Sequence, residues 1–118
     1  MSNFHVFYYR HRTGEEIASH APAPMEVDRI ADLAGDVLEE NGDFLGLVDR
    51  DDSVLQFIYL ARTEEDRKPI RMEIPDVGRK ADLIRHISNA ELSELLRNLP
   101  ERLTTDVVAN PRFAAGRP

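Results

Sequence analysis

The sequence predicts an α+β fold: a roughly four-stranded, mostly antiparallel sheet with two helices, in the order strand, helix, three strands, helix. Two segments repeat apolar residues every three or four positions, which is typical of helices that bury one face. Four other segments are short, rich in aromatic and β-branched residues, and bounded by turn residues, which is typical of strands. The length of 118 residues suits one domain. We place this domain at residues 1–100 and interpret residues 101–118 as a partly mobile C-terminal tail.

The first strand is expected over Phe4 to Arg12, before the turn residues Thr13-Gly14. Its aromatic residues fall on both faces, so we expect the strand to be covered on both sides. The next segment, Glu15 to Pro24, ends in Ala-Pro-Ala-Pro and is interpreted as a connection. Because each proline pushes the residue before it out of the helical region, no helix should begin before about Pro24.

The clearest helix is expected over Met25 to Glu40. Pro24 suits its first turn, where the missing N–H costs nothing, and Asn41-Gly42 provides a stop. Gly35 inside the helix costs up to ~1 kcal/mol relative to alanine, so we expect another element to pack closely there. One stripe of the helix is apolar: Val27, Ile30, Ala31, Ala34, Val37 and Leu38.

A β-hairpin is expected over Phe44 to Arg62. Its first arm is Phe44–Val48, its polar turn is Asp49–Ser53, and its second arm begins at Val54. Five polar residues in the turn indicate a longer hairpin loop rather than a two-residue one.

A third strand is expected over Pro69 to Ile74, after a charged turn at Thr63 to Lys68, and Pro75 should end it. Alternation along this strand places Arg71 and Glu73 outward. The inward residues are apolar: Ile70, Met72 and Ile74.

The last part of the predicted domain contains one ambiguous segment and one clear helix. Ala81 to Ile87 fits either a helical turn or a short strand. Ser88 begins Ser-Asn-Ala-Glu, the pattern of a capping box, in which a serine and a glutamate three residues later bond each other's backbone N–H. We therefore expect the last helix to start at Ser88 and to run to about Leu99, before Pro100.

The charge is uneven along the chain. The net charge is −7, and residues 26–66 hold thirteen acidic side chains against three arginines, a local charge of −10. This distribution argues against nucleic-acid binding, which needs clustered positive charge. It fits either a solvated surface or a protein that meets a basic partner protein. The chain has no cysteine, no apolar run near the ~20 residues that span a bilayer, and no signal-peptide pattern, so we expect a cytoplasmic protein without a membrane partner.

The sequence offers no catalytic motif, and we expect no catalytic residue, no cofactor and no metal site. It contains no nucleophile motif and no glycine-rich phosphate loop. His5 and His11 would lie about 20 Å apart on a strand, too far to share one ion. The segment Asp49-Arg-Asp-Asp resembles half of a calcium loop but lacks the central glycine and the distal glutamate, so we interpret it as a solvated turn.

Three polar residues lie within predicted strands and are the candidates for a ligand pocket: Gln56, Tyr59 and Glu73. Gln56 would need hydrogen-bond partners if its face is the buried one, because an unsatisfied buried polar group costs ~1–3 kcal/mol. If Leu55 and Phe57 form the buried face, Gln56 faces the other side. The sequence leaves both options open.

The middle of the chain resembles a family of small proteins. The residues concerned are Asn41-Gly-Asp-Phe-Leu-Gly-Leu-Val, Val54-Leu-Gln-Phe and Met72-Glu-Ile-Pro75. They are similar to the α+β immunity proteins of bacterial polymorphic toxin systems, where a strand ending in Leu-Gln precedes a strand carrying an acid. The resemblance covers residues 41–75, and this chain lacks the tryptophan that such proteins typically carry near the acid. It implies a protein that neutralises a toxin by binding it, without chemistry of its own.

We therefore expect a small acidic binding protein without catalytic activity, of the immunity type, that meets a basic protein. The alternative is a small-molecule-binding domain or small enzyme with a pocket between sheet and helices. The acids expected to form one partner-binding surface lie on the first helix and the hairpin turn: Asp28, Asp32, Asp36, Glu39, Asp49, Asp51 and Asp52.

Overall fold

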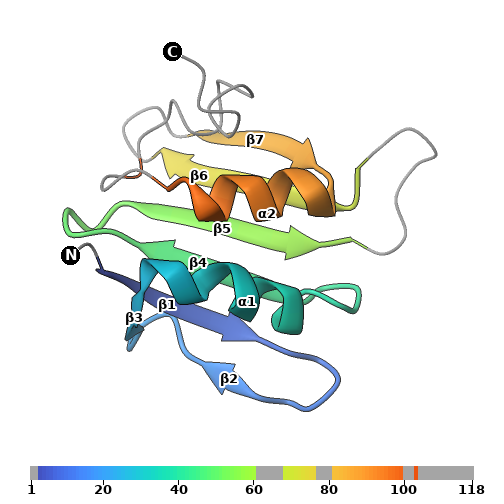
Figure 1. The fold of residues 1–118 in the computed structure, drawn as a ribbon, viewed down its shortest axis with the longest axis horizontal. Coiled ribbons are helices and arrows are strands. Elements are labelled where there is room, and N and C mark those ends of the chain that lie inside the picture. Colours follow the sequence, from blue (N-terminus) through green and yellow to red (C-terminus); the bar gives the residue numbers. More distant parts are fainter. Residues whose placement is uncertain (1–2, 61–67, 77–80, 100–102, 104–118) are drawn as a thin grey trace.

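The computed structural model describes residues 3–60, 68–76, 81–99 and 103, which form an α+β fold (Figure 1). The elements follow the order β1 (Asn3–Tyr9), β2 (Glu16–Ile17), β3 (Ala23–Glu26), α1 (Val27–Val37), β4 (Phe44–Val48), β5 (Val54–Tyr59), β6 (Ile70–Asp76), β7 (Ala81–Ile87) and α2 (Asn89–Arg97). The strands form one sheet in the order β2-β1-β4-β5-β6-β7, with β3 also paired to β1, and every pairing is antiparallel. The predicted class is confirmed, but the described residues contain seven strands instead of four.

Both helices cover the same face of the sheet and run in opposite directions (Figure 1), so that α1 begins beside the end of α2. The sheet buries alternate residues against them, because successive side chains of a strand point to opposite faces. The core between the two layers contains Phe4, Val6, Tyr8, Leu45, Leu47, Leu55, Phe57, Ile30, Ala34, Val37, Leu92, Leu95 and Leu96. Neither helix within the described residues is long and apolar enough to cross a membrane.

The segment expected as a connection, Glu15 to Pro24, instead contributes the strand β2 and half of the strand β3. β3 pairs with β1, and Pro24 lies opposite His5 in that register. The restriction that prolines place on their neighbours excludes a helix, but it favours an extended strand equally well. Among the described strands β3 pairs only with β1, and a strand with one partner tolerates a proline, which has no N–H to donate.

Helix α1 is shorter than expected at both ends. It begins at Val27, after Glu26 in an extended conformation, because residues up to Glu26 pair with β1. It ends at Val37 because the Asp43 carboxylate takes the backbone N–H groups of Glu39 and Glu40, at 3.0 and 2.6 Å. In a continued helix these two N–H groups would bond carbonyls four residues earlier.

The hairpin and the last helix agree with the sequence interpretation. Strands β4 and β5 flank the expected five-residue turn. Helix α2 carries the predicted capping box, in which Glu91 N donates to Ser88 Oγ at 3.1 Å and Ser88 N donates to Glu91 Oε1 at 2.8 Å. The ambiguous segment Ala81–Ile87 is a strand, and β6 continues through Pro75 to Asp76 instead of ending before it.

The two glycines inside regular elements have opposite surroundings. A Cβ on Gly46 of β4 would overlap the Phe7 ring, which lies across this glycine from the neighbouring strand. Phe7 is thereby buried on the face of the sheet opposite the helices, as the aromatic residues on both faces of β1 predicted. Gly35 of α1 is exposed, and a Cβ there would meet nothing within 4 Å, so the expected close packing at Gly35 is wrong.

The predicted tail and the charged turn expected at Thr63 to Lys68 fall mostly outside the described residues. Residues 61–67 and 104–118 are among those not described, so the turn at 63–67 and nearly all of the tail stay predictions. Leu103 is described, and it is buried in the core with 2% of its surface exposed.

Candidate functional site

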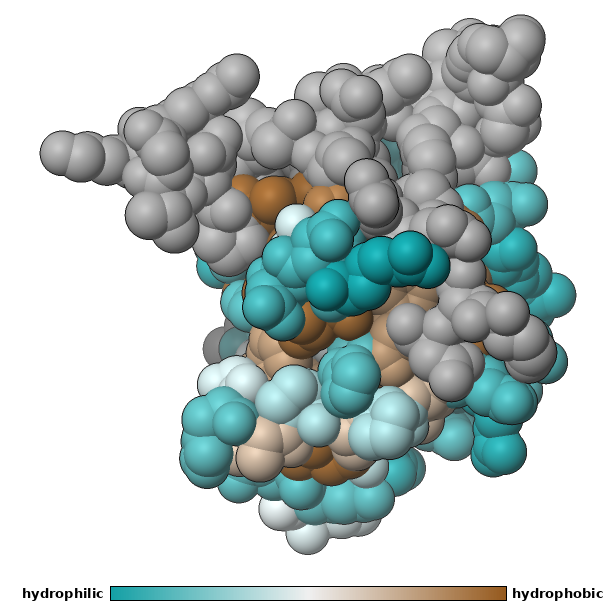
Figure 2. Space-filling model, turned by 90° about the vertical axis from the view of Figure 1, so that its left-hand side faces the viewer, coloured by the Kyte–Doolittle hydropathy of each residue, from teal (hydrophilic) through white to brown (hydrophobic). Residues whose placement is uncertain are grey.

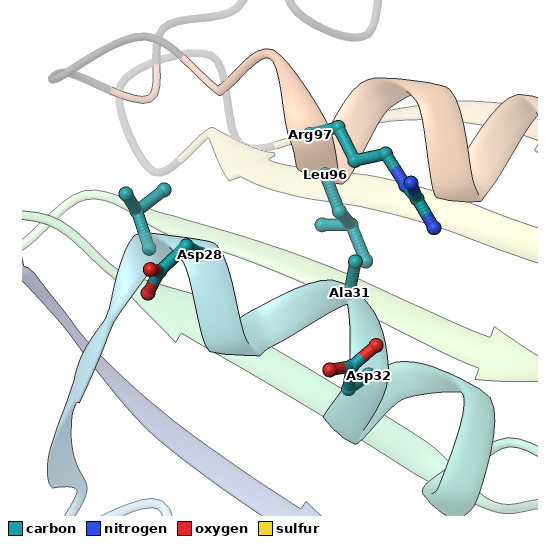
Figure 3. Close-up of a pocket in the computed structure, with 6 residues that line it drawn as sticks. Asp28, Ala31, Asp32, Leu96 and Arg97 are labelled. Atoms are coloured by element: carbon teal, nitrogen blue, oxygen red, sulfur yellow. The ribbon is translucent and has the colours of Figure 1, made fainter.

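A hollow of the described surface lies between α1 and α2, and we call it the interhelical groove. Its wider end has a volume of about 370 Å³, and its narrower end adds about 160 Å³. Ala31 and Leu96 line both parts, so the hollows are continuous along the helix pair. The wider part is lined by Val27, Asp28, Ala31, Asp32, Leu96 and Arg97 (Figure 3).

The floor of the groove is apolar and built from small residues of α1 and leucines of α2. Leu96 and Ala31 point toward each other across the gap in Figure 3. The narrower part adds Ala34 and Gly35 from α1 and Leu92 from α2. Seen from the end where α1 begins, apolar surface occupies the middle of the described part and hydrophilic surface borders it (Figure 2).

One side of the groove is acidic. Asp28, Asp32 and Asp36 follow one another at intervals of four residues on α1, and all three are exposed. Asp28 and Asp32 line the groove, and Asp36 continues the row about one turn further along α1, outside the lining. Residues four apart lie on one side of a helix, about 6 Å apart along its axis. Within the described residues, these three carboxylates take part in no hydrogen bond or ion pair. We call this row the acidic wall; Asp28 also lies in the first turn of α1, where a negative charge stabilises the helix dipole.

The opposite side of the groove is polar and carries one positive charge. Asn89, Ser93 and Arg97 follow α2 at the same four-residue interval. Arg97 Nε donates to Ser93 Oγ at 3.3 Å, and the Arg97 guanidinium reaches along the rim of the groove (Figure 3). The groove therefore presents carboxylates on α1 and a guanidinium on α2.

Glu39, the fourth predicted acid of the first helix, lies beyond the end of α1 and forms ion pairs. Its Oε1 lies 2.8 Å from Arg12 Nη2 and 3.8 Å from Arg10 Nη2. These contacts connect the end of α1 to the turn between β1 and β2. Glu39 is thus engaged within the protein, unlike the residues of the acidic wall.

Asp49 was expected in a solvated turn but is only 4% exposed, and this expectation is wrong for its side chain. Its Oδ1 accepts from the backbone N–H groups of Asp51 and Ser53, at 2.8 and 2.9 Å. Its Oδ2 accepts from Leu103 N at 2.6 Å, which fixes residue 103 beside the hairpin. Asp49 therefore organises the loop from inside.

Asp51 and Asp52 are exposed in this loop, and Asp52 has a positive φ of 65°. The loop lies at the same end of the sheet as the start of α1 in Figure 1. Of the seven predicted acids, the structure therefore places Asp28 and Asp32 in the lining of the groove, Asp36 further along α1 outside this lining, and the hairpin pair in a separate loop.

Asp43 is a buried carboxylate that the sequence interpretation missed. It is 1% exposed, and its Oδ1 accepts from both the backbone N and the ring Nδ1 of His11, each at 2.8 Å. Burial raises the pKa of Asp43, but the hydrogen bonds from His11, Glu40 and Glu39 outweigh burial and hold this pKa below its ordinary value. The only local signal was an acid directly after Asn41-Gly42, which is also typical of an exposed turn.

The histidines do not converge. His5 and His20 are exposed, His11 contacts Asp43, and His86 belongs to β7. Within the described ranges, no three histidine or acidic side chains gather in a way that would hold a metal ion.

The three candidates for a ligand pocket lie on two different faces of the sheet. Leu55 and Phe57 are the buried residues of β5, so Gln56 faces away from the helices. Gln56 Nε2 lies 3.4 Å from Glu73 Oε1 on that face, and Glu73 is 8% exposed although it points away from the core. Tyr59 instead packs against the core. The described residues therefore do not bring these three side chains into one pocket between sheet and helices.

Comparisons of the chain with family models, with curated proteins and with solved structures found no match.

Proposed function

We propose that this protein is a non-catalytic binding protein that engages a basic partner protein through the interhelical groove. The observation that carries the proposal is the acidic wall: three exposed carboxylates at regular spacing, without partners among the described residues, two of which line an open hollow with an apolar floor. A carboxylate that is already in an ion pair attracts a further cation less strongly, because its charge is partly neutralised. The acidic wall has no such competitor within the described part of the chain, whereas Glu39 has two.

The charge of the chain supports a basic protein as the partner. The net charge of −7, with −10 in residues 26–66, would repel phosphate groups and attract lysine and arginine side chains. Opposite charge across an interface raises the association rate more than the affinity, and salt screens this effect. The resemblance to immunity proteins supports one form of this function, in which the protein neutralises its partner by covering a basic surface.

The alternative function, a ligand pocket between sheet and helices, has less support. Gln56 and Glu73 lie on the face of the sheet that the helices do not cover, and the groove itself is an open depression. Ligand sites usually enclose most of their ligand, whereas partner proteins bind to open surfaces.

The test is affinity capture from an extract of the native host, followed by association kinetics with the captured partner. The test variant replaces Asp28, Asp32 and Asp36 by asparagine. The control variant, Glu16→Gln/Glu40→Gln/Glu94→Gln, removes the same charge from exposed positions outside the acidic wall and outside the seven predicted acids.

We expect the test variant to associate roughly ten-fold or more slowly, and the control variant to retain most of the wild-type rate. The wild-type rate should also fall as salt increases. Equal rates for the two variants would mean that the acidic wall serves only solubility, and would contradict the proposal.

A further inference from the structure

We infer that the segment of the partner that occupies the interhelical groove is an amphipathic α-helix with a row of basic residues at four-residue spacing. This inference rests on the proposed function and names the class of the partner's binding element. Shape, backbone hydrogen bonding and charge each support it.

The shape of the groove suits a helix because both of its sides are helices. Rows of side chains four residues apart form ridges on a helix, and a third helix packs its own ridges between them. The 11 residues of α1 and the 9 residues of α2 span about 16 and 14 Å, roughly three turns. A partner helix of three or four turns would therefore contact the whole groove.

The small residues of α1 leave room for close approach. Ala31 and Gly35 belong to the lining of the groove, and the space above Gly35 is open even to an added Cβ. A side chain of the partner helix can fill this space. Because Leu92 and Leu96 are already almost completely buried, the apolar contact is limited, and charge must provide much of the recognition.

The backbones of α1 and α2 favour a helix over a β-strand as the occupant. A strand that binds a protein surface usually adds to a sheet edge, where free N–H and C=O groups receive it. The middle turns of α1 and α2 use their backbone groups in their own helices and offer none to a partner. The backbone N–H and C=O groups of a helix are already paired within the helix, so it can lie on such a surface without leaving these groups unpaired.

The charges on the two sides of the groove define which flank of the partner helix faces α1 and which faces α2. Lysines or arginines at four-residue spacing would lie about 6 Å apart and would meet Asp28 and Asp32 in the lining of the groove, with Asp36 about one turn further along α1. Arg97 on the opposite side of the groove favours an acidic residue on the other flank of the partner helix. The expected segment is therefore basic on one flank, apolar toward the groove, and acidic near Arg97.

The test uses two synthetic peptides of roughly 14 residues, which as helices would span ~21 Å. The first carries lysines at four-residue spacing on one flank, leucine and alanine toward the groove, and glutamate on the other flank. The second is identical except for a central proline, which breaks the helix at a cost of ~3 kcal/mol while leaving the charges unchanged. Binding of both peptides to the full chain is measured by calorimetry, and helix formation by circular dichroism.

We expect the first peptide to bind one per chain with a gain of helix, and the proline peptide to bind at least ten-fold more weakly, a difference of about 1.4 kcal/mol. Asp28→Asn/Asp32→Asn/Asp36→Asn should weaken the first peptide, and the control variant from the previous section should not. If both peptides bind equally and their binding depends on the acidic wall, the inference that the partner segment is a helix is wrong, while the proposal of a basic partner still stands.

Absence of binding by the first peptide would also overturn the inference, while the kinetics with the captured partner would still decide the proposed function separately.

Discussion

At the scale of single residues, the two most informative side chains are the acids Asp43, which the sequence interpretation missed, and Asp49, which it placed in a solvated turn. Asp43 and Asp49 are both buried, and both accept hydrogen bonds from backbone N–H groups in the segments that follow or flank strand β4. Local sequence could not reveal this, because an aspartate in a turn is equally typical of solvated loops. Besides these local donors, each carboxylate has one distant partner: His11, 32 residues from Asp43, and Leu103, 54 residues from Asp49.

Asp43→Asn should destabilise the protein by about 1–3 kcal/mol. The asparagine has the same shape but loses the charge, and its amide can accept on one side only, so at least one backbone N–H of His11, Glu39 or Glu40 loses its partner. Urea unfolding measures the change. Asp36→Asn, an exposed change on α1, is the control and should alter the free energy of unfolding by less than about 0.5 kcal/mol. A neutral effect of Asp43→Asn would contradict the structural role assigned to Asp43.

The contribution of Asp43 should depend on pH. Because its pKa in the folded protein lies below the ordinary value of about 3.9, the ionised form stabilises the fold. This stabilisation is present above the ordinary pKa and is lost as the pH falls through the lower, folded pKa. The difference in unfolding free energy between wild type and Asp43→Asn should therefore be constant near neutral pH and shrink below about pH 4. A difference that grows on acidification would have the wrong sign.

At the scale of elements, local signals predicted some segments well and others badly. The last helix was predicted because Ser88 and Glu91 lie in its own first turn and form the capping box. Strands β2 and β3 were missed because they are short and exist through pairing with β1. The end of α1 was misplaced because Asp43, outside the helix, receives the N–H groups that would extend it.

Ser88→Ala should destabilise the protein by about 0.5–2 kcal/mol, because it removes the acceptor of Glu91 N. Ser88→Asn keeps an acceptor at the cap and should recover most of the loss. Thermal or urea unfolding of the two variants gives the comparison. If both variants lose the same stability, the capping bond is not the cause.

Alanine substitutions at Gly46 and Gly35 should have opposite effects on stability. Gly46→Ala places a Cβ where the Phe7 ring lies and should cost about 1–3 kcal/mol through overpacking. Gly35→Ala meets no atom within 4 Å and should stabilise α1 by roughly 0.5–1 kcal/mol. In the double variant Gly46→Ala/Phe7→Leu, the smaller side chain should restore part of the loss. Equal effects at the two glycines would contradict the packing of Phe7 over β4.

At the scale of the whole molecule, the candidate site arises where two helices distant in sequence meet on one face of the sheet. The four-residue spacing of Asp28, Asp32 and Asp36 is visible in the sequence, and it places the three acids on one side of a helix. The groove is not visible there, because it needs Leu96 and Arg97 of α2 to lie beside α1. The predicted continuous surface included Glu39 and Asp49, and ion pairs or burial engage both within the protein.

Mapping of backbone amide NMR signals shows whether the acidic wall and the groove beside it form the binding surface. Spectra of the labelled chain are compared with and without the partner captured from the host. We expect the largest changes to cluster at Asp28, Ala31, Asp32, Leu96 and Arg97. Unchanged signals at these residues, with changes on the opposite face of the sheet around Glu73 and the half-exposed Ile84, would contradict the proposed binding surface.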